Sequence, residues 1–69
     1  MAKATKTNEI LIDVCIYCDE DSDGEFYTVS DSGQDFDDCL YEGETAKADA
    51  EADAEERVAH YGKSRIVWK

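Results

Sequence analysis

Hydrophobic and polar residues alternate near the start of the chain, over Ile10–Ile16. A strict period of two built from β-branched residues predicts a strand with one buried face. A shorter apolar run, Phe26–Val29, predicts a second strand, and Phe36–Tyr41, which Asp37 and Asp38 interrupt, predicts a third. The segments between them, Asp19–Gly24 and Asp31–Gln34, are rich in Asp, Ser and Gly and predict turns.

A helical pattern follows over Ala46–Tyr61, which is rich in alanine and contains neither Gly nor Pro. Apolar residues at spacings of four, four and three form one stripe along this helix: Ala50, Ala54, Val58 and Tyr61. Thr45 can serve as the N-cap, and Gly62 follows the helix as a C′ residue. Ser64–Lys69 predicts a final short strand.

The element order β-β-β-α-β predicts an α+β fold, in which one helix packs on a small antiparallel sheet of three or four strands. With 69 residues the chain forms a single domain, residues 1–69, and we expect the polar residues 1–8 to be frayed. A chain of this length buries only about 60% of its unfolded surface. Its core is too thin to hold a deep catalytic cleft, so we do not expect an enzyme.

Charge adds more to this picture than overall composition does. Eighteen acids against seven Lys and Arg give a net charge of −11, and sixteen of the acids but only one base lie between Asp19 and Glu56. Such a field repels nucleic acid and anionic membranes, and attracts basic protein grooves or cations. The sequence shows no transmembrane run or signal peptide, and its three cysteines are expected to stay reduced in a cytoplasm.

The spacing of the acids resembles that of a nucleic-acid backbone. Alternate strand residues lie about 6.6–6.8 Å apart on one face, and residues four apart on a helix lie about 6 Å apart. Phosphates advance about 3.4 Å per nucleotide along the DNA axis and are farther apart through space. Rows of carboxylates can therefore approximate a row of phosphates. The acids expected to contact a partner are Asp19, Glu20, Asp21, Asp23, Glu25, Asp35, Asp37, Asp38, Glu42, Glu44, Asp49 and Asp53.

Metal binding is the competing explanation for some of these residues. The run Asp19–Gly24 opens like a calcium-binding EF-hand loop, but Ser30 stands at the twelfth position, where a glutamate is needed. A hairpin turn is therefore preferred, and a looser calcium or magnesium site stays open. A zinc site would use Cys15, Cys18, Cys39 and His60. Cys15 and Cys18 are three apart in a predicted strand and point to opposite faces, so we expect buried apolar cysteines, and no metal or cofactor.

Dense like charge must have a reason, because each exposed like-charged i,i+4 pair costs about 0.2–0.5 kcal/mol of stability. Three explanations compete: adaptation to a salty cytoplasm, a solvated face without a specific partner, and mimicry of nucleic acid. We favour mimicry. The chain would occupy the groove of a basic nucleic-acid-binding protein, without itself binding nucleic acid or a membrane.

The acidic block Asp19–Glu56 and the short β-rich layout with one helix resemble small phage-encoded anti-CRISPR proteins that act as DNA mimics. This resemblance implies a stoichiometric inhibitor in the cytoplasm of an infected bacterium. Its target would be a type I CRISPR surveillance complex, Cascade, at the surface that reads the protospacer-adjacent motif.

A second resemblance is to the antitoxin HicB. It rests on the strand Phe26–Val29, on Gly43-Glu44-Thr45 opening a helix, and on the alanines Ala50 and Ala54. That family neutralises a small RNA-binding toxin. The resemblance therefore implies a small basic toxin as the partner.

Overall fold

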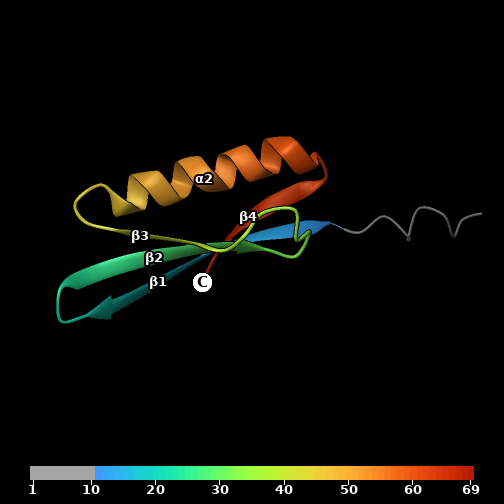
Figure 1. Cartoon of the computed structure of the whole chain (residues 1–69). Coiled ribbons are helices and arrows are strands. Elements are labelled where there is room, and N and C mark those ends of the chain that lie inside the picture. The colour runs from blue at the N-terminus through green and yellow to red at the C-terminus, as the bar shows by residue number, and fades with distance from the viewer. Residues whose placement is uncertain (1–10) are drawn as a thin grey trace, which may run out of the picture.

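Residues 11–69, the part of the chain that the computed structural model describes, form four strands and one helix (Figure 1). In chain order these are β1 (Ile12–Asp21), β2 (Gly24–Asp31), β3 (Cys39–Glu42), α2 (Ala46–Tyr61) and β4 (Ser64–Trp68). The α+β class and the order β-β-β-α-β are as predicted. Residues 1–8, for which a frayed start was predicted, lie outside the described residues.

The four strands make one mixed sheet in the order β3-β2-β1-β4. β1 pairs antiparallel with β2, and β2 antiparallel with β3, whereas β4 pairs parallel with β1. The expectation of an antiparallel sheet therefore needs correction at β4. The helix α2 carries the chain back along the sheet after β3, so the next strand enters in the direction of β1, as crossover connections require.

The hairpin of β1 and β2 is longer than predicted. Asp19 pairs with Phe26, Glu20 with Glu25, and Asp21 with Gly24, which leaves only Ser22 and Asp23 as the turn. Gly24 has φ +122°, a conformation that favours glycine. The acids from residue 19 to residue 21 are thus strand residues, because cross-strand pairing outweighs their low strand propensity.

The third strand is shorter than predicted and begins at Cys39 instead of Phe36. The residues before it belong to a loop that runs over the C-terminal half of the helix. In that loop the carbonyl oxygen of Asp37 accepts a hydrogen bond of 2.6 Å from Arg57 Nη2. This hydrogen bond holds the Asp37 carbonyl toward the helix, so residues 36–38 do not extend the pairing of β3 with β2.

The core lies between α2 and one face of the sheet. Val14, Ile16 and Val29 are fully buried against three alanines of the helix: Ala46, Ala50 and Ala54. Alanine allows the helix backbone to lie close to the sheet. The predicted apolar stripe is confirmed for Ala50 and Ala54, while Val58 and Tyr61 pack on the core and stay partly exposed.

The ends of α2 fall where they were predicted, but only one of them is capped as expected. Thr45 occupies the N-cap position without a side-chain cap, because its Oγ1 donates to the Asp49 carboxylate at 2.9 Å. Gly62 has φ +81° and its N–H donates to the Val58 carbonyl at 2.9 Å, which closes the helix. Within residues 11–69, no helix is long and apolar enough to cross a membrane.

The sheet face turned away from α2, called the open face below, is covered by no element of residues 11–69 (Figure 1). Strand register places the pair Asp13 and Arg65 at one end of it and Asp21 with Gly24 at the other, with three rows of side chains between them. One row joins Val67, Cys15 and Ser30; the next joins Tyr17, Thr28 and Leu40; the third joins Asp19, Phe26 and Glu42. Tyr17 and Leu40 are exposed to 44% and 56%. The open face therefore has apolar side chains at its centre, although no helix covers it.

Candidate functional site

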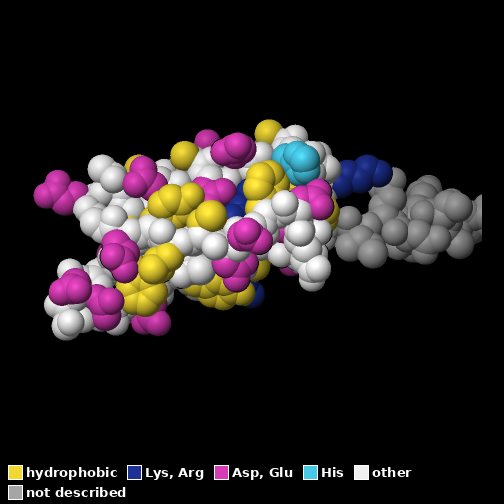
Figure 2. All heavy atoms as spheres, in the orientation of Figure 1, with side chains coloured by type: hydrophobic (Ala, Val, Ile, Leu, Met, Phe, Trp, Pro, Cys, Tyr) yellow, Lys and Arg dark blue, Asp and Glu magenta, His cyan; other side chains and the backbone are white. Residues whose placement is uncertain are grey.

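The twelve predicted partner-binding acids fall into three groups in the structure. Seven of them gather at one end of the molecule, three lie in the loop between β2 and β3, and two lie on α2. Figure 2 shows acidic side chains over much of the visible face, gathered at the end where the β1–β2 turn and the β3–α2 loop lie. We call the seven residues at this end the acidic end: Asp19, Glu20, Asp21, Asp23, Glu25, Glu42 and Glu44.

Two structural elements build the acidic end. The hairpin contributes five acids, and the segment from β3 into α2 contributes the other two. Pairing of Phe26 with Glu42 brings the two elements together. A groove of about 480 Å³ lies between them, lined by Asp23, Glu25, Tyr27, Gly43, Glu44 and Lys47. Asp23 and Glu25 of the hairpin thus lie across this groove from Glu44, far apart from it in sequence.

Repulsion at the acidic end is built into the strand register. Glu20 and Glu25 are directly opposite each other on adjacent strands, which destabilises a hairpin. Asp19 and Asp21 share the other face of β1, about 6.6–6.8 Å apart as alternate strand residues. Among residues 11–69 none of these four takes part in an ion pair. Lys47 lines the groove beside Glu25 without an ion pair to these acids, so repulsion remains that solvent ions or a partner can relieve.

The loop acids Asp35, Asp37 and Asp38 lie apart from the acidic end. The Asp35 carboxylate contacts His60 Nε2 at 3.1 Å, and both side chains are more than half exposed. The loop itself is held by its backbone, since the Asp35 N–H donates to the Tyr61 hydroxyl at 2.9 Å. These acids are placed on the side of the C-terminal half of α2, away from the hairpin turn.

The two helix acids differ from each other. Asp49 is exposed and accepts the hydrogen bond from Thr45. Asp53 is only 12% exposed and is used inside the fold: its Oδ1 accepts from Arg57 Nε at 2.8 Å, and its Oδ2 accepts from the Tyr41 hydroxyl at 2.8 Å. Asp53 thus stabilises the packing of α2 on β3, while Glu51 and Glu55 form the exposed acidic row of the helix.

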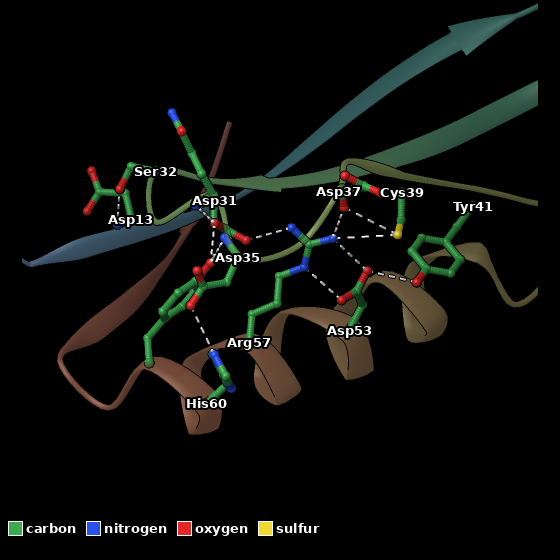
Figure 3. Close-up of polar contacts among 12 residues, drawn as sticks. Asp13, Asp31, Ser32, Asp35, Asp37, Cys39, Tyr41, Asp53, Arg57 and His60 are labelled. Atoms are coloured by element: carbon green, nitrogen blue, oxygen red, sulfur yellow. Dashed lines mark hydrogen bonds and ion pairs between the residues drawn. The ribbon is translucent and has the colours of Figure 1, made fainter.

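A buried arginine organises this interior network (Figure 3). Arg57 is 1% exposed, and its guanidinium donates to Asp53, to Asp31 Oδ2 at 2.7 Å and to the carbonyl of Asp37. The Asp31 side chain is 0% exposed and also accepts from the Tyr61 hydroxyl at 2.6 Å. Every buried side-chain polar atom in the described part of the chain has a partner. A charged cluster is tolerated in a core only when it is satisfied in this way.

The network shifts the pKa values of its members. Burial by itself raises the pKa of Asp31, but hydrogen bonds from Tyr61, the Gln34 N–H and Arg57 outweigh it and hold that pKa below the ordinary value. For Arg57, burial alone lowers the pKa, and Asp53 and Asp31 together raise it above the usual value. The bond to Asp53 raises the pKa of the Tyr41 hydroxyl. All three groups keep one charge state at neutral pH, which suits a structural role.

Reasoning from the sequence missed Arg57 and Asp31. The available signal was the position of Arg57, three residues after Ala54 and so on the same side of the helix as the buried alanines. A base in such a stripe, with Asp53 one turn earlier, indicates a buried ion pair rather than a surface pair. Asp31 carried no comparable signal, because it was one of several polar residues in a predicted turn.

The cysteines show no metal-binding arrangement. Cys15 lies on the open face, and Cys18, paired with Tyr27, lies on the face toward α2. Cys15, Cys18 and Cys39 are free thiols, and the expectation that they are buried is wrong: Cys15 and Cys39 are partly buried, and Cys18 is exposed because its position lies near the hairpin end, beyond the core residues. Among residues 11–69, no group of three or more His, Cys, Asp or Glu side chains is arranged to hold a metal ion. Asp19 and Asp21 stand along a strand, and Asp23 stands in the turn, instead of converging.

Comparison of the chain with models of known protein families, with curated proteins and with solved structures finds no match.

Proposed function

We propose that this chain is an acidic inhibitor that mimics nucleic acid and occupies the positively charged groove of a nucleic-acid-binding protein. The observation that supports the proposal best is the acidic end, where the hairpin and the β3–α2 segment hold seven acids without a base paired to any of them among residues 11–69. Acids of the interior, such as Asp31 and Asp53, are neutralised by Arg57 instead. The fold therefore separates structural carboxylates from those left for a partner.

Electrostatics would govern this interaction. A protein of net charge −11 is drawn to a basic groove by long-range attraction, which speeds association and is weakened by salt. Carboxylates of the acidic end would take the places of phosphates. Binding would exclude the nucleic acid sterically, and the complex would need no chemical step.

The resemblance to anti-CRISPR proteins suggests the target. We propose the surface of a type I CRISPR surveillance complex that reads the protospacer-adjacent motif, because this surface is basic and receives duplex DNA. In that case the protein acts in the cytoplasm of an infected bacterium.

Competition with nucleic acid tests this function. The tagged protein would be incubated with lysate of the native host, and the captured proteins would be eluted with duplex DNA or with salt. The proposal expects a nucleic-acid-binding complex that DNA releases and that high salt releases as well. If the captured proteins resist competing DNA, or none binds nucleic acid, mimicry is refuted.

Charge variants give the same test at residue level. In the triple variant Asp19→Asn, Asp21→Asn and Asp23→Asn, the asparagines keep the side-chain acceptors that bond to the Glu20 and Asp23 N–H groups. We expect it to fold and to lose most of its affinity. The matched control changes Glu51, Glu55 and Glu56 to Gln, with the same change in net charge. Equal losses in both variants would mean that only net charge matters, and that the acidic end has no special part.

The antitoxin function remains the second candidate, and one observation favours it. β2 contains Phe26–Val29 and α2 begins directly after Gly43-Glu44-Thr45, which is the order of strand and alanine-rich helix on which the resemblance to HicB rests. A fold of this kind serves many functions, so the order alone decides nothing. The test is the genomic neighbourhood: a small basic toxin encoded beside this chain, bound by it and inhibited by it, would replace the first proposal.

A further inference from the structure

The open face of the sheet combines an apolar centre with an acidic border. Its centre holds Cys15, Tyr17, Phe26, Thr28, Leu40 and Val67, and its border toward the hairpin turn holds Asp19, Asp21 and Glu42. Asp19 and Asp21 lie on β1, which also supplies Tyr17 to the centre, and Glu42 lies on β3, which also supplies Leu40. The two features therefore form one continuous surface.

The size of this face is that of an interaction site. β1 has ten residues, which span about 30 Å, and three strand spacings of about 4.8 Å add roughly 14 Å, so the flat area is about 400 Å². The apolar centre takes up part of this area and the charged border the rest; apolar patches on monomers are often functional. Tyr17 and Leu40 flank Thr28 in one row at its centre and are 44% and 56% exposed. Tyrosine and other large apolar side chains are typical anchors of interfaces.

Charge decides what can cover the face. A second copy of this chain also carries a net charge of −11, so long-range repulsion opposes self-association by this face. A neutral apolar partner would leave Asp19, Asp21 and Glu42 unpaired at the edge of the contact. A surface with an apolar centre and Lys or Arg at its border complements both features.

We infer that the open face is the surface that docks on the partner, with Tyr17, Phe26 and Leu40 as apolar anchors and with Asp19, Asp21 and Glu42 pairing with bases at the border. The partner is then a basic protein surface with an apolar patch beside its cationic residues. The choice of a basic partner rests on the proposed function. The exposed acids of α2, on the opposite side of the molecule, contribute only to the long-range field.

Two synthetic peptides of equal length and charge test this inference, one alternating arginine with leucine and the other arginine with serine. Each would be titrated into the isotope-labelled protein and followed by backbone amide shifts. We expect the leucine peptide to bind about tenfold tighter or more, the gain from burying one large apolar side chain. Its shifts should centre on Tyr17, Phe26 and Leu40. Equal affinities, no binding of the leucine peptide, or shifts centred on Glu51 and Glu55 would each overturn the inference.

Paired variants locate the contact. The double variant Tyr17→Ser and Leu40→Ser should lower the affinity of the leucine peptide to that of the serine peptide, at low and at high salt alike. Both side chains are outside the core, so the melting temperature should stay near that of the parent. The control is Trp68→Ser, which removes an aromatic residue of similar exposure, 47%, from the edge strand on the α2 side. An equal loss in the control contradicts the assignment to the open face.

These measurements use neither nucleic acid nor a host protein, so their outcome is independent of the competition experiment. If DNA fails to displace the captured partner while the leucine peptide binds the open face, the mimicry proposal fails and the docking surface stands. If DNA displaces the partner but the peptide contacts α2, the mimicry proposal stands and the docking surface is refuted.

Discussion

Replacing Arg57 by methionine removes the only base of the interior network and keeps most of the side-chain volume. The substitution leaves the Asp31 carboxylate, 0% exposed, and the Asp53 carboxylate, 12% exposed, without their cation. The hydrogen bonds from Tyr61 and Tyr41 remain, but neither hydroxyl carries a compensating charge. Removing one partner of a buried ion pair costs about 3–5 kcal/mol.

This loss is large for a chain of this length. At about 0.05–0.15 kcal/mol per residue, 69 residues give a free energy of unfolding of roughly 3–10 kcal/mol. The Arg57→Met variant should therefore be marginally folded at neutral pH. Urea denaturation followed by circular dichroism measures it, and Arg57→Lys, which keeps the charge but not the fork of donors, should fall between parent and variant.

The pH dependence should reverse its sign in this variant. In the parent, the pKa of Asp31 is lowered on folding, so its contribution is present above the unfolded value of about 3.8 and is lost as the pH falls through the folded value. Without Arg57, burial of Asp31 should dominate and raise its pKa. The variant should then gain stability on acidification from pH 7 to pH 5, where the parent does not.

Two outcomes would refute this reasoning. The first is a free energy of unfolding for Arg57→Met within about 1 kcal/mol of the parent, less than the buried-pair cost allows. The second is a variant that gains no stability between pH 7 and pH 5. Adding Asp31→Asn and Asp53→Asn to Arg57→Met removes both unpaired charges and should recover part of the loss, which separates the charge effect from the loss of packing.

Three further predictions concern other parts of the fold. Gly33→Ala should lower the melting temperature strongly, because a Cβ there would lie 2.5 Å from Tyr61 Cε1, and the Tyr61 hydroxyl is held by Asp31 and the Asp35 N–H. Gly43→Ala is the control: no atom lies within 4 Å of its Cβ, so it tests the backbone strain at φ +100° without a clash. Glu25→Lys should raise the free energy of unfolding at low salt by about 0.2–1 kcal/mol, because the lysine would pair with Glu20 on the adjacent strand. This gain should become smaller at high salt. A variant less stable than the parent would contradict the pairing of residues 20 and 25. Ultraviolet titration should find the pKa of the Tyr41 hydroxyl above its ordinary value, owing first to its hydrogen bond with Asp53. Because this pKa is raised on folding, the contribution of Tyr41 to stability is present below about pH 10 and is lost at higher pH. The variant Asp53→Asn should lower the pKa of Tyr41.

Several local features followed from the sequence alone. The bounds of α2 were predicted because alanine-rich propensity and a terminal glycine act within a few residues. The alternation before residue 17 predicted β1 with its buried Val14 and Ile16, since the strand period is a local geometric fact. The dense acids of residues 19–56 were likewise visible as a field, because net charge needs no coordinates.

The arrangement of these parts was decided by the tertiary structure. Low strand propensity placed Asp19–Asp21 in a turn, but pairing with β2 over the whole hairpin made these residues a strand. The direction of β4 depends on the path of α2 across the sheet, which no local pattern contains.

The tertiary structure also decided which charged residues are buried and which are exposed. Asp53 resembled its exposed neighbours on the helix, yet it lies against Arg57 and Tyr41 because the loop and β3 close over that side of the helix. Whether a carboxylate stabilises the interior or stays available to a partner depends on which bases approach it in space. The sequence of this chain determines how many acids there are and where they lie along it. The packing of α2 on one face of the sheet decides which of these acids are buried, and it leaves the other face open.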